Sequence, residues 1–300
     1  MDKRGYLFVL LTALVSGVSI FLNTFAVKGI NPYVFTFSKN VLVVVFLLSL
    51  LLLFNEIKSF KLLSKMQWFK LVLIGLVGGS VPFLLFFKGL SMSASSTASL
   101  LHKSMFFLVA LLAVLFLKEK LNWRFAVAAL LLFAGNYLLL ESKSFAFGVP
   151  EMLILGAVAF WSVETIISKH VLKEVSSRVV AFGRMFFGSL FIFVFLAATG
   201  NLQGIASLSV PQFGWIAFTS VLLLAYVTTW YAGLQRVPAS IASCILVLGS
   251  AVTTVLSFAY SGSFSFAGLA GAALIISGVV LVAGYSYFAS KLKFLFPSQN

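Results

Sequence analysis

Apolar stretches of about 17 to 25 residues recur along the whole chain, and their length is the feature that most restricts its fold. A helix of this length crosses the roughly 30 Å hydrocarbon core of a bilayer, where backbone polar groups must be satisfied within the protein. With 61% hydrophobic and 9% charged residues, the 300-residue chain has too little polar surface for a soluble globule. The pattern predicts an all-α integral membrane protein with ten transmembrane helices, at roughly 5–27, 32–53, 69–89, 95–116, 124–140, 149–168, 178–199, 211–231, 239–260 and 265–288.

The charged residues between these stretches predict how the chain is oriented. A net charge of +14 is compatible with nucleic-acid binding, but the basic residues are distributed among loops and form no single stripe. With the amino terminus inside, most basic loop residues lie on the cytoplasmic side, against Lys28 and Lys143 outside. We therefore expect a multi-pass protein of the inner or plasma membrane, embedded in lipid, with both termini cytoplasmic and no nucleic-acid partner.

A short motif occurs twice in the chain. Residues 86–99 read FFKGLSMSASSTAS and residues 230–243 read WYAGLQRVPASIAS, with Gly89 aligned on Gly233. The two copies stand at the same place in two sets of five predicted helices. Because five is odd, the second set enters the membrane upside down relative to the first, which predicts an inverted repeat.

The repeat also predicts the domain organisation. We expect a first five-helix unit over residues 1–143, a second over 144–290, and a cytoplasmic tail over 291–300. Inverted repeats place a solute site where the two units meet, so the predicted architecture surrounds a central cavity.

Four ionisable residues lie clearly inside predicted spans, away from the span ends, where a charge is costly unless it faces protein or water. Lys39 and Lys103 lie at a similar predicted depth with no acid nearby, which favours an anionic or zwitterionic solute between them. The alternative is that their long side chains snorkel to the outer interface. Glu164 and Arg184 lie at a similar predicted depth on the cytoplasmic side of the membrane. We interpret them either as an inner gate or coupling pair, or as an ion pair that only holds two helices together.

Polar and aromatic residues at helical spacing extend this candidate site. Serines and threonines on such faces also occur where helices pack closely, and a tyrosine and a tryptophan four residues apart also occur in packed cores. These residues therefore either line a solute site or only pack the helices together. Together with Lys103 and Lys39, the residues that we predict to bind substrate are Asn23, Ser99, Trp161, Tyr226, Trp230 and Ser243.

One predicted helix contains its own irregularity. Gly78 and Gly79 are followed by Pro82 inside the span 69–89, where proline removes a backbone hydrogen bond. The segment is either a static kink or a hinge used when the protein changes conformation.

The sequence offers little support for an enzyme. It contains no glycine-rich phosphate loop, no nucleophile elbow and no His, Cys, Asp or Glu set at metal-ligand spacing, so we predict no cofactor and no metal site. The single cysteine, Cys244, excludes a disulfide within one chain.

The two copies of the motif resemble the aromatic, aromatic, x, Gly or Ala, Leu pattern of EamA-type transporters of the drug/metabolite transporter superfamily. The run LFLKEKLNWRFAVAALLLFAG, residues 115–135, is similar to the segment that joins helices 4 and 5 in that family, with Glu119 at the acidic position. The chain departs from the pattern at Gly262, where the second copy often has an acid, and at Met105 and Gly249, where proline is frequent. The resemblance implies ten helices in two inverted repeats, a central cavity and alternating access.

These observations together predict the function. We expect a secondary active transporter that moves a small polar organic solute, an amino acid or an organic anion or metabolite, by alternating access. A non-transporting membrane scaffold or regulatory protein, or a passive channel, would explain the same polar faces. The glycine-rich helices 5 and 10 leave a homodimer open.

Overall fold

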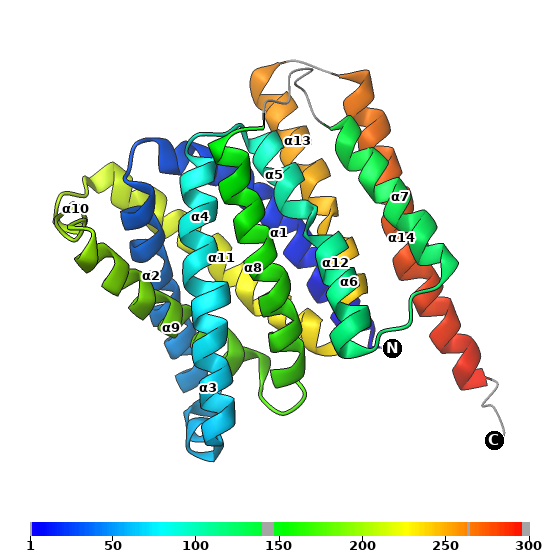
Figure 1. Ribbon diagram of the computed structural model, residues 1–300, viewed down its shortest axis with the longest axis horizontal. Helices are drawn as coiled ribbons and strands as arrows, with labels where there is room; N and C mark the ends of the chain where they lie inside the picture. Colours follow the sequence, from blue (N-terminus) through cyan, green and yellow to red (C-terminus); the bar gives the residue numbers. More distant parts are fainter. Residues whose placement is uncertain (1, 140–146, 263–264, 296–300) are drawn as a thin grey trace.

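The computed structural model describes residues 2–139, 147–262 and 265–295, and the part of the chain that it describes contains helices and no strand. The predicted boundary at 143–144 and the last five residues of the predicted tail lie outside it. The elements (Figure 1) are α1 (Lys3–Lys28), α2 (Pro32–Leu53), η1 (Glu56–Leu62), α3 (Lys65–Ile74), η2 (Gly75–Ser80), α4 (Val81–Leu90), α5 (Ser95–Lys103), α6 (Met105–Leu117), α7 (Trp123–Leu138), α8 (Val149–Val171), α9 (Ser177–Ala198), α10 (Gln203–Ala206), α11 (Val210–Arg236), α12 (Ala239–Leu246), α13 (Leu248–Ser261) and α14 (Phe266–Leu295).

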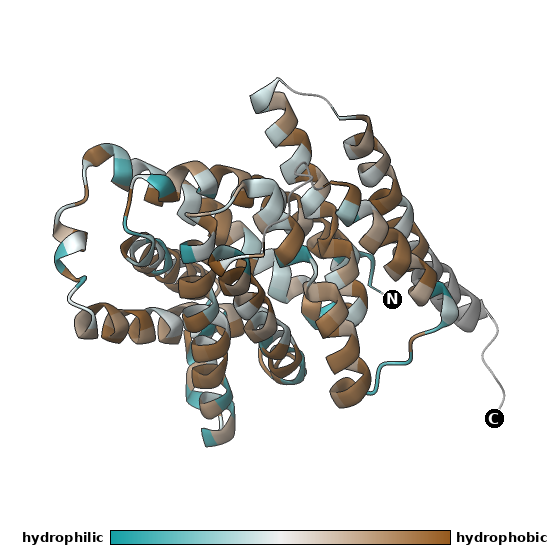
Figure 2. Ribbon diagram, turned by 45° about the horizontal axis from the view of Figure 1, so that its top comes forward, coloured by the Kyte–Doolittle hydropathy of each residue, from teal (hydrophilic) through white to brown (hydrophobic). Residues whose placement is uncertain are grey.

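Nine helical segments within the described residues are long and apolar enough to cross a membrane. Three of these segments are composite, because α3 to α4, α5 to α6, and α12 to α13 each make up one membrane-spanning segment. A tenth apolar helix, α7, is shorter. Figure 2 shows hydrophobic residues along the length of the helices and hydrophilic ones gathered at their ends and in loops, as a multi-pass membrane protein requires.

Helices that are distant in sequence form the main contacts. α1 packs against α11 and α13, α2 against α9, and α4 against α8. α7 and α14 pair with each other at one side of the bundle (Figure 1). An added Cβ on Gly135 of α7 would lie 2.6 Å from the carbonyl oxygen of Gly271 in α14. Glycines of these two helices thus serve packing within one chain.

Local capping explains where several helices begin. The Asn31 side chain accepts a hydrogen bond from the Tyr33 backbone N–H at 2.9 Å, and Pro32 occupies the first turn of α2, where its missing N–H costs nothing. Ser64 and Gln67 form a capping box at the start of α3.

The predicted irregularity at Gly78, Gly79 and Pro82 coincides with a π-helical segment, η2, between α3 and α4. Pro82 has no N–H to offer to the carbonyl of Gly78, four residues earlier, and the indole Nε1 of Trp161 donates to that oxygen at 3.0 Å. The Gly79 carbonyl accepts from Asn40 Nδ2 at 3.1 Å. Side chains of α8 and α2 therefore satisfy the carbonyls that the irregular backbone releases.

The predicted spans 95–116 and 239–260 coincide with composite helices. The first divides at Ser104 and the second at Val247, one residue before the position that corresponds to Ser104 in the second half, Leu248. The backbone tightens at both places: Ser104 N–H donates to Leu101 O at 3.2 Å, and Val247 N–H donates to Cys244 O at 3.2 Å. Asn136 Nδ2 of α7 donates to the Leu100 carbonyl at 3.1 Å, beside the first break.

Candidate functional site

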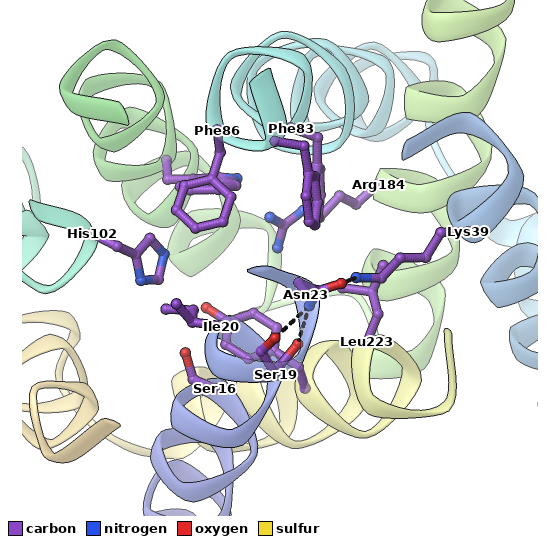
Figure 3. A pocket seen from close by; sticks show the side chains of 13 residues that line it. Ser16, Ser19, Ile20, Asn23, Lys39, Phe83, Phe86, His102, Arg184 and Leu223 are labelled. Carbon is purple, nitrogen blue, oxygen red and sulfur yellow. Dashed lines mark hydrogen bonds between the residues drawn. The ribbon is translucent and has the colours of Figure 1, made fainter. Parts of the chain in front are cut away.

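A cavity lies within the bundle (Figure 3), with about 480 Å³ of empty space that includes a part open to the outside. Seven helices contribute to its wall: α1, α2, α4, α5, α8, α9 and α11. Four of these helices, α1, α2, α4 and α5, belong to the first half of the chain, and three, α8, α9 and α11, belong to the second. Its lining residues are Ser16, Ser19, Ile20, Asn23, Lys39, Phe83, Phe86, Phe87, His102, Trp161, Arg184, Leu223 and Tyr226.

Lys39 brings a buried ammonium group to the cavity. The residue is 1% exposed, so its side chain does not snorkel to a surface. Its Nζ donates to Asn23 Oδ1 at 2.9 Å and lies 4.6 Å from the centroid of the Phe87 ring. An amide oxygen and an aromatic face thus stabilise this cation, and no described carboxylate forms a salt bridge with it.

Arg184 provides the second buried cation, and its hydrogen bonds are incomplete. Its Nη1 donates to the hydroxyl of Tyr231 over a long 3.4 Å, and its buried Nε has no hydrogen-bond partner. The guanidinium lies 5.4 Å from the centroid of the Phe83 ring and 5.8 Å from that of Tyr231. The guanidinium therefore retains donor capacity for a further acceptor.

The predicted pair of Glu164 and Arg184 is connected through a third residue. No salt bridge within 4.0 Å joins them in the described structure. Instead, the Tyr231 hydroxyl donates to Glu164 Oε1 at 2.6 Å while it accepts from Arg184. Ser168 also donates to Glu164 Oε1. The direct ion pair that we weighed as an alternative is therefore absent, because a tyrosine lies between the two charges.

Lys103 is as deeply buried as Lys39, at 1% exposure, but it does not line the cavity. Its Nζ donates to Ser16 Oγ at 2.5 Å, and Ser16 does line the cavity. An added Cβ on Gly249 would lie 3.0 Å from this Nζ and 2.8 Å from Ala13 O. The departure from the family pattern at Gly249 thus leaves room for the lysine.

The other residues predicted to bind substrate divide into two groups. Asn23, Trp161 and Tyr226 line the cavity with Lys39. Trp230 stacks on Tyr226 at 6.4 Å between ring centroids, one layer further from the cavity. Ser99 donates to Thr253 and Ser243 to the Ser240 carbonyl, so the structure uses both serines in contacts between or within helices.

The sequence analysis did not predict four of the lining residues: Phe83, Phe86, Phe87 and His102. Three of them are phenylalanines in a chain with 34 phenylalanines, so residue type alone could not distinguish them from core residues. The repeat did contain a signal: with Gly89 aligned on Gly233, Phe87 corresponds to Tyr231. The structure places Lys39 over the first ring and Arg184 over the second.

Glu119, the acid that the resemblance singled out, caps a helix of the other half of the chain. Its carboxylate accepts from the backbone N–H groups of Ala239 at 2.7 Å and Ser240 at 3.1 Å, and also from the Ser240 hydroxyl. A carboxylate at a helix N-terminus is favourable because it meets free N–H groups and the positive end of the helix dipole. This contact joins the loop after α6 to the start of α12.

Glu56 of η1, outside the membrane-spanning segments, forms a salt bridge with Arg178 in the first turn of α9. Burial raises the pKa of Glu56, but hydrogen bonds from Arg178 and Ser176 together outweigh it, and the pKa of this carboxyl lies below its usual value.

A bundle of apolar helices around a cavity that contains buried cationic and polar side chains is an architecture typical of membrane transport proteins. The model of the EamA-like transporter family matches residues 3–141 and again residues 149–284, and the chain belongs to this family, within the drug/metabolite transporter superfamily.

Individual relatives agree with this assignment. The chain is similar to the riboflavin transporter ImpX of Fusobacterium nucleatum, with 28% identity over 82% of this chain and 89% of that protein. It is also similar to an uncharacterized transporter of Clostridium kluyveri, with 24% identity over 97% and 96% of the two chains. A solved crystal structure with 18% identity superimposes with a TM-score of 0.75 over 98% of this chain and 100% of the other, which shows the shared fold.

Proposed function

We propose that this protein is a secondary active transporter of the cell membrane, inner or plasma, that moves a small polar organic solute by alternating access. The observation that carries the proposal is a cavity within the bundle that receives the buried cations Lys39 and Arg184 from two different helices. An amino acid or an organic anion or metabolite would supply the acceptors that these cations lack. The protein would act without catalysis or a bound cofactor.

The proposal includes ten membrane crossings in two inverted repeats, over residues 1–143 and 144–290, with both termini and the tail 291–300 in the cytoplasm. Three observations support it. α7 pairs with α14 and supplies the tenth apolar helix. The family model matches the chain twice. The helix breaks at Ser104 and Val247 lie within one residue of corresponding positions in the two halves, and the rings under the two cations, Phe87 and Tyr231, correspond directly.

Two elements are suited to the movement that alternating access requires. The bridge from Glu164 through Tyr231 to Arg184 joins α8, α11 and α9, and breaking it would separate these helices. The π-helical segment with Gly78 and Gly79, followed by Pro82 in the first turn of α4, departs from regular α-helical bonding, so it can act as a hinge.

Counterflow in proteoliposomes tests the transport function. Vesicles loaded with unlabelled solute should transiently accumulate labelled solute from outside, with riboflavin, amino acids and organic acids tried as separate solutes because one relative is a riboflavin transporter. Accumulation against a gradient identifies a carrier. Equilibration alone would indicate a channel, and no protein-dependent movement of any solute would favour the scaffold.

Variants connect the assay to the cavity. Lys39→Gln should reduce counterflow by about tenfold or more, because it removes a charged hydrogen-bond donor from the binding site. Lys103→Ala should also abolish transport while the protein still folds, through loss of support for Ser16. Lys28→Gln, which changes an exposed lysine at the end of α1, is the matched control and should transport normally. Unchanged transport by Lys103→Ala would remove Lys103 from the site.

A further inference from the structure

The two ends of the cavity differ in chemistry. In Figure 3, Lys39 and Arg184 lie together on one side, near Asn23, while His102 and Phe86 lie on the opposite side. A ligand that spans the cavity therefore meets the two cations, with the rings of Phe87 and Phe83 beside them, at one end, and rings without a lining cation at the other.

The cationic end has no carboxylate on its described wall and no direct salt bridge to one. No Asp or Glu is among the described lining residues. The nearest described acid in the bonding network is Glu164, and its Oε1 already accepts from Tyr231 and Ser168. Arg184 Nε is buried without a partner. Buried charge without compensation is unfavourable, so an anion bound here would gain charge-assisted hydrogen bonds from groups that are already in place.

The opposite end is a cluster of rings from three helices. The centroid of the Trp161 ring lies 5.0 Å from that of His102 and 5.4 Å from that of Phe86. Phe86, His102 and Trp161 are all buried, and Phe83, which meets Trp161 edge to face at 5.5 Å, lies between this cluster and Arg184. Aromatic clusters of this kind bind a further flat ring through stacking and edge contacts, at distances of about 4.5–7 Å between centroids.

We propose that the ligand of this cavity is an aromatic organic anion: a molecule with a planar ring for the cluster of Phe86, His102 and Trp161 and a carboxylate or phosphate for Lys39 and Arg184. The inference rests on the proposed function for the role of the cavity and specifies its substrate class. It differs from a general anion site because the rings exclude small hydrophilic anions from half of the wall. It differs from a purely hydrophobic site because the cations need an acceptor.

Binding to the purified full-length protein tests this class with three matched probes: 3-phenylpropanoate, its neutral amide 3-phenylpropanamide, and the non-planar anion 3-cyclohexylpropanoate. Equilibrium dialysis with labelled probes gives the three affinities, and thermal stabilisation provides a second measurement because a ligand that binds only the folded protein raises its melting temperature. The aromatic acid should bind about tenfold or more tightly than the amide, given the strength of hydrogen bonds between charged groups. It should also bind more tightly than the cyclohexyl acid.

Two variants separate the two ends of the site. Lys39→Gln should remove most of the preference for acid over amide and retain the preference for the planar ring. Phe86→Leu should do the reverse. Lys28→Gln is the control and should keep both preferences. The melting temperature without ligand and a monodisperse elution profile establish that each variant is folded.

Several results would overturn the inference. Equal affinity of the wild-type protein for acid and amide would refute the anionic part, and equal affinity for the phenyl and cyclohexyl acids would refute the aromatic part. Failure of all three probes to bind at millimolar concentration would refute both. Binding in the expected order without counterflow would refute the transport function and leave the ligand class in place, so the two proposals fail separately.

Discussion

The hydroxyl of Tyr231 is the centre of a buried network, and its removal is the most direct test of that network. Tyr231→Phe keeps the ring beside Arg184 and deletes only the oxygen that bonds Glu164 at 2.6 Å. The other half of the chain already has phenylalanine, Phe87, at the corresponding position. The substitution therefore changes hydrogen bonding with little change in shape.

Two ranges of measured hydrogen-bond free energies limit the expected loss of stability. Hydrogen bonds between membrane helices average about 0.6 kcal/mol and reach about 1.7 kcal/mol, whereas hydrogen bonds to charged groups in proteins contribute about 1.5–3 kcal/mol. Glu164 is 1% exposed and Tyr231 is fully buried, so water cannot replace the lost bond. We expect Tyr231→Phe to lower the free energy of unfolding by about 1.5 kcal/mol, where the two ranges meet.

The assay is reversible unfolding in mixed micelles, performed as a double-mutant cycle with Glu164→Gln. The two substitutions should be coupled by about 1 kcal/mol, since each removes one side of the same bond. Tyr33→Phe is the matched control, because the Tyr33 ring packs on Phe195 and its hydroxyl makes no hydrogen bond to the described residues. Coupling below about 0.3 kcal/mol, the level expected of independent sites, would show that the bridge is not a unit and would refute the reasoning.

Two further predictions concern packing and pH. Gly79→Ala places a Cβ 2.1 Å from Arg184 O and should destabilise the fold by about 1–3 kcal/mol. Gly156→Ala is the control, because its Cβ would meet its nearest neighbour at an ordinary 3.4 Å, and it should be neutral or stabilising in the same unfolding assay. Equal stability of the two variants would contradict the packing argument. The lowered pKa of Glu56 means that its salt bridge with Arg178 contributes stability above the ordinary carboxyl pKa and loses it as the pH falls through the folded-state value. Glu56→Gln should therefore flatten the acid side of the stability profile, and an unchanged acid profile would show that this carboxyl is not responsible.

Much of the fold was predictable because its causes are local in the chain. Hydropathy and length are properties of a contiguous segment, and they predicted apolar helices that the structure places at the same positions, from α1 at Lys3–Lys28 onward. The repeated motif and the segment around Glu119 were sufficient to identify the family. Proline chemistry located the irregular segment at Gly78 and Gly79, since a missing N–H has the same consequence in any helix.

The site required the tertiary structure. Whether a polar side chain faces the cavity depends on the rotation of its helix and on the helices packed against it, which are distant in sequence. Lys39 and Lys103 were equivalent by depth and charge, yet one lines the cavity and the other lies behind Ser16. The chain alone determined that buried cations would need partners inside the bundle, because hydrocarbon offers none. Only the packing of α8, α9 and α11 decided that a tyrosine would stand between Glu164 and Arg184, because that position depends on contacts among three helices.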